Sequence, residues 1–424
     1  MTARKRLLFL TDVFPFPLDR GQRVRVRHLL AACSRTFDVT FLGPAPSDDR
    51  DRALVEPHCV KARYVSPLSP TERLTFRRVV VAARLLPGLP RRRTIRQYEP
   101  FLTALRDVGA EAFDYVWAER PHMARLCTSL SSRTILDLDD IEHVKLARRM
   151  RVERSLRQRV HGYYRYLFFR RLELSWSKRF LATVVCSDED RRYLVDHGCG
   201  NAIVVPNGVS GAVSSDGPPS GPPSQRHRSG ERLRVLFLGN VQSDPNIDAI
   251  RFFADEILPR LRAQTRDVSF DVIGPHATPD VERNFGSNVR FRGFVPDLVS
   301  AMAEYDVLAA PLRFGGGTKL KVLDAMAQGL PVVTTRVGAE GLSVRHNEHA
   351  LIVESAADFA EAILRVWRDC DLADRLAANA YALMRESFSW DSIEERLAEW
   401  LRGLDGHDGG VRSATSGQAG VMQS

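Results

Sequence analysis

Short, wholly apolar runs alternate along this chain with longer segments of helical period. Leu7–Leu10 and Val307–Ala310 are two such runs, each bounded by polar or turn residues. Runs of this kind are typical of strands buried on both faces of a parallel sheet. After the second run, Leu320, Leu323 and Ala327 recur at the spacing of one helix face. The alternation predicts repeated strand–helix–strand units, and therefore an α/β fold with parallel sheets.

The apolar pattern is interrupted by a stretch with almost nothing to bury. Residues 210–232 are rich in Gly, Pro and Ser, which is typical of an exposed linker. A chain of 424 residues also exceeds one ordinary hydrophobic core. We therefore predict an N-terminal domain over residues 1–209 and a C-terminal domain over residues 233–386. An amphipathic helix over 387–404 and a polar, glycine-rich, disordered tail over 405–424 follow.

Composition and charge narrow the classes of partner. Apolar residues make up 44% of the chain and charged residues 27%, as in soluble globular proteins. The net charge of +9 favours anionic partners, namely nucleotide phosphates, a pyrophosphate lipid, an acidic membrane face or nucleic acid. No apolar stretch approaches the roughly 18 residues of a spanning helix, and Leu7–Leu10 is too short for a signal-peptide core. The six cysteines are scattered without a CxxC pair, so we expect reduced thiols in a cytoplasmic protein.

A glycine loop within Val307–Thr335 carries the strongest candidate chemistry. Three consecutive glycines at 315–317 stand between a predicted buried strand and a predicted helix, which Thr318 could cap. Bare backbone N–H groups at the positive end of a helix suit a phosphate or a sugar hydroxyl. Lys319 and Lys321 add cationic donors beside them. A tight connector with surface lysines is the alternative interpretation of the glycines alone.

The residues that flank the glycine loop resemble a known sequence pattern. PLRFGGGTKLKVLDAMAQGLPVV, with VGAEGL just after it, resembles the sugar-nucleotide segment of GT4-type retaining glycosyltransferases, which are glycosyl transferases group 1 enzymes of GT-B fold. VVPNGV and GFVPD resemble further words of that family, and the resemblance extends over residues 4–402. It implies two Rossmann-like parallel-sheet domains facing across a cleft, the first for the acceptor and the second for a nucleotide-sugar donor. It also implies that the helix over 387–404 crosses back to the N-terminal domain.

The chain departs from the family pattern in the donor half. The family commonly places two glutamates eight positions apart; here the first falls on Gly316 and the second on Asp324. The resemblance implies that Asp324 holds the ribose hydroxyls. Many relatives also carry Arg or Lys in the turn after the first strand of this domain, where the sequence has Asn240 and Asp248. Neutralising the diphosphate is then expected of Lys319 and Lys321, with Arg313 in addition.

The N-terminal domain offers weaker candidates. The loop FPFPLDRGQRVR resembles the family's N-terminal loop, where Gly21 would allow close approach and Arg23 or Arg25 could meet phosphate; a solvated basic helix is the alternative. Polar clusters follow two further predicted strands, at the edge where open α/β sheets bind ligands. From them we single out His122 and Asp140 for positioning a hydroxyl or handling its proton, although a lone loop histidine is more often a surface residue.

Arginine-rich segments mark the N-terminal domain. Residues 71–96 interleave arginines with apolar residues, and residues 144–180 form a long arginine-rich helical region. One interpretation is a basic surface that binds anionic lipid, which would suit an enzyme whose acceptor is anchored in a membrane. The other is a solvated helix face with its apolar residues turned inward. A nucleic-acid patch is disfavoured, because residues 71–96 lack the interleaved aromatics of single-strand binders.

The resemblance therefore implies a retaining glycosyltransferase that moves a sugar from a nucleotide-diphosphate-sugar to a glycan or lipid-linked acceptor, in surface polysaccharide synthesis. No metal and no further cofactor are expected, because GT-B enzymes neutralise the diphosphate with protein groups. Three alternatives stay open: a catalytically impaired GT-B homologue that binds sugar nucleotides or partners, a sugar-nucleotide 2-epimerase, and a basic surface-binding module. The candidate catalytic residues are His122, Asp140, Lys319 and Lys321. The candidate donor-binding residues are Gly21, Gly239, Asn240, Gly274, Phe294, Val295, Arg313, Gly315, Gly316, Gly317, Thr318 and Asp324.

Overall fold

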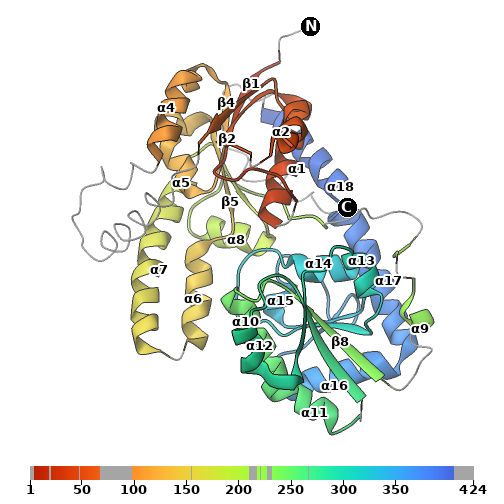
Figure 1. The fold of residues 1–424 in the computed structure, drawn as a ribbon. Coiled ribbons are helices and arrows are strands. Elements are labelled where there is room, and N and C mark those ends of the chain that lie inside the picture. Colours follow the sequence, from red (N-terminus) through yellow and green to blue (C-terminus); the bar gives the residue numbers. More distant parts are fainter. Residues whose placement is uncertain are drawn as a thin grey trace.

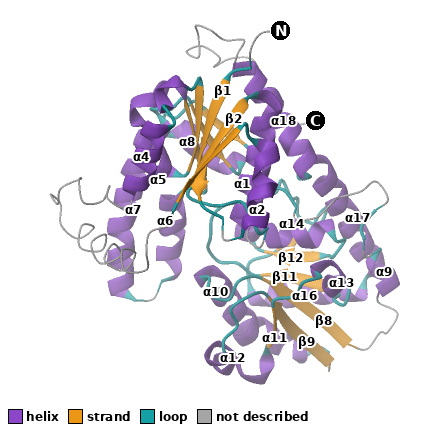
Figure 2. Cartoon of the chain, turned by 45° about the horizontal axis from the view of Figure 1, so that its top comes forward, coloured by secondary structure: helices purple, strands orange, loops and turns teal. Residues whose placement is uncertain are grey.

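The computed structural model describes residues 4–404 except 19–20, 47, 67–97, 154, 210–216, 220, 227–231 and 266. Two α/β bodies lie one above the other, each built around its own sheet (Figure 1). Helices flank both sheets (Figure 2). The predicted basic segment 71–96 and the predicted tail 405–424 lie outside the described residues.

The first body holds a seven-stranded sheet within the described residues, with the strand order β3-β2-β1-β4-β5-β6-β7 and parallel pairing throughout. Its strands are β1 (Arg6–Leu10), β2 (Asp38–Pro44), β3 (Lys61–Val65), β4 (Tyr115–Glu119), β5 (Thr134–Asp139), β6 (Ala182–Val185) and β7 (Ala202–Val204). Its helices are α1 (Gly21–Thr36), α2 (Asp49–Val55), α4 (Glu99–Asp107), α5 (Pro121–Ala124), α6 (Glu142–Val152), α7 (Leu156–Ser177) and α8 (Asp188–Asp196), with 3-10 turns η1 (Glu56–His58), η3 (Ala110–Ala112) and η4 (Arg125–Arg133).

Aromatic side chains fix the register at the centre of this sheet. Phe9 of β1 pairs in register with Phe41 of β2 and Trp117 of β4. The Phe9 ring stacks on both neighbours, with centroid distances of 6.4 and 6.2 Å. All three side chains are fully buried, which is why the sequence shows continuous apolar runs here rather than alternation.

The second body holds a six-stranded parallel sheet with the order β10-β9-β8-β11-β12-β13 within the described residues. Its strands are β8 (Arg232–Leu238), β9 (Asp267–Ile273), β10 (Arg290–Gly293), β11 (Val307–Ala310), β12 (Val332–Thr334) and β13 (Leu351–Ile352). Its helices are α10 (Asp244–Phe252), the π-helical η5 (Phe253–Ile257), α11 (Leu258–Arg262), α12 (Pro279–Phe285), η6 (Gly286–Asn288), α13 (Leu298–Met302), α14 (Leu320–Ala327), α15 (Arg336–Ala339), α16 (Ala356–Arg368) and α17 (Cys370–Ser387). Two Rossmann-like parallel sheets confirm the predicted fold class.

The last helix, α18 (Trp390–Gly403), packs on α1 of the first body (Figure 1). The Trp390 ring stacks on His28 with a centroid distance of 4.2 Å, and the His28 Nδ1 lies 2.6 Å from the Glu394 carboxylate. The Trp390 ring also covers Gly208, where an added Cβ would lie 2.7 Å from it. Helix α18 thus completes the core of the first body.

Two details refine the sequence-based expectation. The arginine-rich helical region 144–180 is a hairpin of two helices, α6 and α7, and the Ser155 hydroxyl caps the second helix by accepting from the Gln158 N–H. Part of the expected linker is structured: α9 (Pro223–Arg226) packs on α17, where the Ser224 N–H donates to Asp374 at 2.8 Å. All six cysteines are free thiols, as expected. Within the described residues, no helix combines the length and apolar character needed to cross a membrane.

Candidate active site

The carboxyl-terminal edges of the two sheets meet through their loops. Four close approaches join them: Gly21 to Leu320, Asp140 to Gly317, Lys145 to Gly316, and Ser187 to Gly341. In the second sheet the strand order reverses between β8 and β11, and open α/β sheets bind ligands at such a switch point. The loops after β8 and β11 therefore form the candidate donor site.

The glycine loop after β11 is shaped by the first body. An added Cβ at Gly316 would lie 2.2 Å from Cγ of Lys145, and one at Gly317 would lie 1.6 Å from a carboxylate oxygen of Asp140. Gly317 also has a φ of +61°, a backbone conformation that residues with a side chain rarely adopt. The missing family glutamate at 316 thus has a local reason: the stem of Lys145 fills the space that its side chain would need.

Thr318 does not cap α14, so that expectation was wrong. Lys319 occupies the N-cap position without a side-chain capping bond. The Thr318 hydroxyl instead donates to the backbone carbonyl of Cys186 in the first body, at 3.5 Å. Thr318 therefore contributes to the contact between the two bodies.

Lys319 and Lys321 flank the loop as expected, and both ammonium groups are engaged. Lys319 Nζ donates to the carbonyls of Gly316 and Gly317 at 2.9 and 2.6 Å. Lys321 Nζ donates to Asn246 at 2.5 Å and lies 4.1 Å from the centroid of the Phe237 ring. An added Cβ at Gly239 would lie 2.8 Å from the Lys321 ammonium, so this group of α14 lies against the turn after β8.

Burial controls the charge of both lysines. It lowers the pKa of Lys319, against the opposing effect of the nearby Glu340 carboxylate. It lowers the pKa of Lys321 to about 7, and the neighbouring Lys319 adds to this shift. Lys321 is therefore poised to change its charge near neutral pH.

Four further donor-side candidates lie on the turns after β8, β9 and β11. The backbones of the turns at Gly239 and Gly274 approach each other closely. An added Cβ at Gly274 would lie 2.0 Å from the Gly239 carbonyl oxygen, so only glycine fits there. Asn240 organises the turn before α10, accepting from the Gln242 N–H and the Asn246 side chain at 2.8 Å each. Arg313 forms an ion pair with Asp248 and thus already has a carboxylate partner.

Phe294, Val295 and Asp324 complete the donor side. Phe294 is 68% exposed and follows the end of β10. Val295 packs against the core of the second body, and Asp324 lies on α14. Exposed Phe294 leaves an aromatic face free at the end of β10.

On the first body, the ends of β1 and β4 bring polar side chains together. His122 Nε2 lies 2.7 Å from Asp12, and the Thr11 hydroxyl and Gln22 amide donate to Glu119 at 2.6 and 3.0 Å. Burial raises the pKa of Glu119 to about 7, although Arg120 opposes the shift. Of this cluster the sequence singled out only His122, whose partner Asp12 lies 110 positions away in the chain.

Asp140 and Gly21 lie where the two bodies meet, but Arg25 does not act as either alternative expected. Asp140 accepts from Lys145 Nζ at 3.0 Å. Arg25 is buried and holds Asp137 through two bonds of 2.9 and 3.1 Å. Its guanidinium group binds a buried carboxylate of β5. It is therefore neither available to a phosphate nor exposed on a solvated helix face.

Helix α6 supplies contacts that sequence reasoning missed. Arg148 donates to Glu340 and, at 3.1 Å, to the carbonyl of Gly315. Arg149 pairs with Asp244 at 2.8 Å. Together with Lys145, these residues connect the first body to the second, at the glycine loop and beside it. The arginine-rich composition was the available signal, but it could not tell which residues face the second body.

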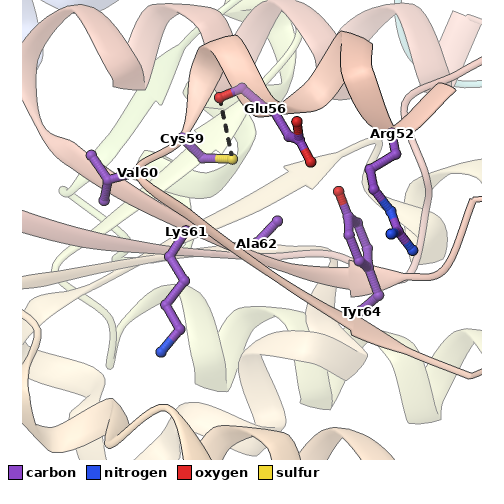
Figure 3. Close-up of a pocket in the computed structure, with 7 residues that line it drawn as sticks. All are labelled: Arg52, Glu56, Cys59, Val60, Lys61, Ala62 and Tyr64. Carbon is purple, nitrogen blue, oxygen red and sulfur yellow. Dashed lines mark hydrogen bonds between the residues drawn. The ribbon is translucent and has the colours of Figure 1, made fainter. Parts of the chain in front are cut away.

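A separate pocket of about 480 Å³ lies at the edge strand β3 (Figure 3). There the Arg52 guanidinium sits 5.1 Å from the Tyr64 ring centroid, and burial raises the pKa of Cys59 to about 11. No candidate site residue lines this pocket. Within the described residues, no group of three or more His, Cys, Asp or Glu side chains is placed to hold a metal ion.

Comparison with known proteins places the second body in a family context. Residues 232–369 match the family described as Glycosyl transferases group 1. An "Uncharacterized 44.6 kDa protein in cps region" of Klebsiella pneumoniae is 24% identical over 164 residues, which are 36% of this chain and 42% of that one. A GDP-mannose-dependent alpha-(1-6)-phosphatidylinositol monomannoside mannosyltransferase of Mycobacterium tuberculosis is 27% identical over 197 residues, 43% of this chain and 50% of that one. The chain spans about half the length of these curated relatives.

Solved structures match over both bodies. Sucrose-phosphate synthase from Thermosynechococcus elongatus aligns with a TM-score of 0.68 and 18% identity, covering 95% of this chain and all of that one. Anabaena Alr3699/HepE in complex with UDP and glucose aligns with a TM-score of 0.62 and 18% identity, covering 94% of this chain and all of that one. Residues 232–369 therefore match the glycosyl transferases group 1 family, and the two bodies together have the GT-B fold.

Proposed function

We propose that this protein is a retaining glycosyltransferase, moving a sugar from a nucleotide-diphosphate-sugar to a glycan or lipid-linked acceptor in the synthesis of a surface polysaccharide at the cytoplasmic face of the membrane. The observation that carries the proposal is the glycine loop 315–317 at the switch point of the second sheet, flanked by Lys319 and Lys321. A mannosyltransferase using GDP-mannose among the relatives, and HepE bound to UDP among the solved structures, support a donor of this class.

In this proposal the second body binds the donor. Asp324 holds the ribose hydroxyls, and the exposed Phe294 ring with the backbone near Val295 faces the base. The diphosphate lies by the backbone N–H groups of the glycine loop and by Lys321. Its departure places negative charge on the leaving oxygen, and donors fixed in advance at that point lower the barrier. A nearby diphosphate would also favour the charged form of Lys321.

The first body holds the acceptor. His122 and its partner Asp12 are positioned to take the proton of the attacking hydroxyl, since imidazole and carboxylate lie 2.7 Å apart. Asp140 sits against Gly317, where it can orient that hydroxyl toward the donor. Retention of the anomeric configuration is proposed on the resemblance of the donor segment.

Lys145 extends the proposal beyond the residues found in the sequence. Burial lowers its pKa, but the carboxylates of Asp140 and Glu142 outweigh burial and raise the pKa above its ordinary value. Lys145 therefore stays charged at neutral pH while its stem lies on Gly316. It is placed to supply, from the first body, cationic charge that Asn240 and Asp248 do not supply.

Binding of one nucleotide should raise the unfolding midpoint of the purified protein. We expect a response to one of UDP, GDP, ADP, dTDP and CMP, because a ligand at 100 times its Kd adds roughly 2.7 kcal/mol to the unfolding free energy. Thermal shift measures this directly, and Lys321→Met should reduce the response. A folded sample that responds to none of the five would argue against a nucleotide-sugar enzyme.

Donor affinity should also depend on pH through Lys321. Burial holds its pKa near about 7, so the ammonium is present below that pH and is lost as the pH rises through it. We expect affinity for the nucleotide sugar to fall by up to about tenfold per pH unit above 7, until the pKa in the complex is reached. Calorimetric titration with an intact nucleotide sugar, whose phosphates do not titrate in this range, measures the effect. The Lys321→Met variant should lack this slope; an equal slope in the variant would assign it to another group.

A catalytically impaired homologue is the second candidate. Gly316 in place of the family glutamate, Asn240 and Asp248 in place of basic residues, and Arg313 already paired with Asp248 favour it. Nucleotide-sugar binding without hydrolysis or transfer would support this candidate. Conversion of a UDP-sugar without any acceptor would point instead to an epimerase.

A further inference from the structure

The outer face of α7 carries an unbroken row of exposed apolar side chains. Leu156, Val160, Tyr163, Tyr164, Leu167 and Phe168, here called the α7 stripe, are between 43% and 75% exposed. Their spacing of three and four residues places them along one side of the helix. Elsewhere in the described residues, the exposed large apolar side chains are Leu18, Leu54, Val60, Val195, Phe294 and Val299, which form no such row.

The opposite face of α7 is already occupied. Glu173 is buried and accepts from His143 of α6 at 2.5 Å, and Arg165 pairs with Glu142 of α6 at 3.1 Å. Both views place α7 on the outer side of α6, away from the second body (Figures 1 and 2). The stripe therefore faces outward because α6 fills the inner side of the hairpin.

Apart from one buried glutamate, the acidic and basic side chains of α7 itself are all arginines or histidine. Helix α7 contains five arginines and a single acidic residue, the buried Glu173. Arg157 and Arg171 lie exposed at the two ends of the stripe. A second copy of this chain would bring a like-charged face against it, which is unfavourable. An apolar stripe with aromatic residues, flanked by arginines, instead matches an anionic lipid surface.

We propose that α7 lies flat on an anionic membrane, with the α7 stripe inserted among the lipid headgroups and the flanking arginines on the lipid phosphates. The same hairpin places Lys145 and Arg148 of α6 on the glycine loop. Membrane contact on the outer side of the hairpin would thus bring the site on its inner side close to the bilayer. A lipid-linked acceptor rests on the proposed function, whereas the surface contact itself does not.

Vesicle co-sedimentation tests the proposal with the full chain. Wild type should bind phosphatidylcholine vesicles that contain phosphatidylglycerol, and bind pure phosphatidylcholine vesicles weakly. The variant Tyr163→Ser, Tyr164→Ser, Phe168→Ser should partition at least roughly tenfold less, because three buried apolar contacts are removed. Arg157→Gln with Arg171→Gln should weaken binding and flatten its salt dependence. Leu54→Ser with Val60→Ser, which removes exposed apolar side chains outside α7, is the matched control and should bind as wild type.

Three outcomes would overturn the proposal. If the stripe variant binds anionic vesicles as well as wild type does, the membrane contact lies elsewhere. If wild type does not bind anionic vesicles, the protein makes no such membrane contact. Light scattering that shows a wild-type dimer and a monomeric stripe variant would assign the stripe to a second copy. Thermal shift with nucleoside diphosphates is run on the same samples: a retained response shows that the variant is folded. Failure of that response in wild type would count against the proposed function alone.

Discussion

Replacing Gly316 with glutamate, the residue that the family pattern places there, should lower sugar transfer by roughly a hundredfold or more. An added Cβ at this position already lies 2.2 Å from Cγ of Lys145, so the longer side chain would push α6 off the glycine loop. A displacement of about 1 Å between reacting groups can cost about a hundredfold in rate. Initial rates of transfer or of donor hydrolysis measure the loss.

Two further variants show whether the space around Lys145 is the cause. Gly200→Glu is the matched control, because an added Cβ there meets nothing within 4 Å, and it should keep wild-type activity. The double variant Gly316→Glu with Lys145→Ala should lose less activity than the product of the two single losses, since Lys145→Ala removes the stem that occupies the space. Higher activity in Gly316→Glu would contradict this account and show that the chain lacks a functional acid.

Replacing Lys321 with methionine should lower kcat/KM for the donor by about a hundredfold to a thousandfold. Methionine keeps much of the stem that packs near Phe237 but removes the ammonium at the switch point. Loss of one fixed donor to developing charge typically has an effect of this size. Steady-state kinetics with the nucleotide sugar found by thermal shift give the value.

Lys61 provides the control for this substitution. It is an exposed lysine on β3, in the pocket at the sheet edge, and Lys61→Met should leave kcat/KM unchanged (Figure 3). Wild-type kinetics in Lys321→Met, in a folded protein, would remove Lys321 from the donor site. The diphosphate would then have to be neutralised by Lys319 and the cations of α6.

Local patterns were sufficient for the elements of the fold. The buried run Val307–Ala310, the three glycines after it and the helical spacing from Leu320 onward are properties of neighbouring residues, and the structure has β11, the loop and α14 there. The sequence did not show where the helical region 144–180 divides into α6 and α7, because the arginine-rich composition is continuous across the turn between them. The apolar side chains of α7 could not be assigned to an inner or an outer face without knowing where α6 lies.

The sequence by itself determined the two parallel sheets, the place of the glycine loop and the lysines beside it, because periodicity, turn residues and short-range spacing carry that information. Only the tertiary structure decided what these groups touch. Lys145 lies on Gly316, Asp12 on His122 and Cys186 on Thr318 because two separately folded bodies, or distant strands of one sheet, meet at those atoms. Such contacts depend on how whole domains pack, and no local pattern encodes a distance between residues more than a hundred positions apart.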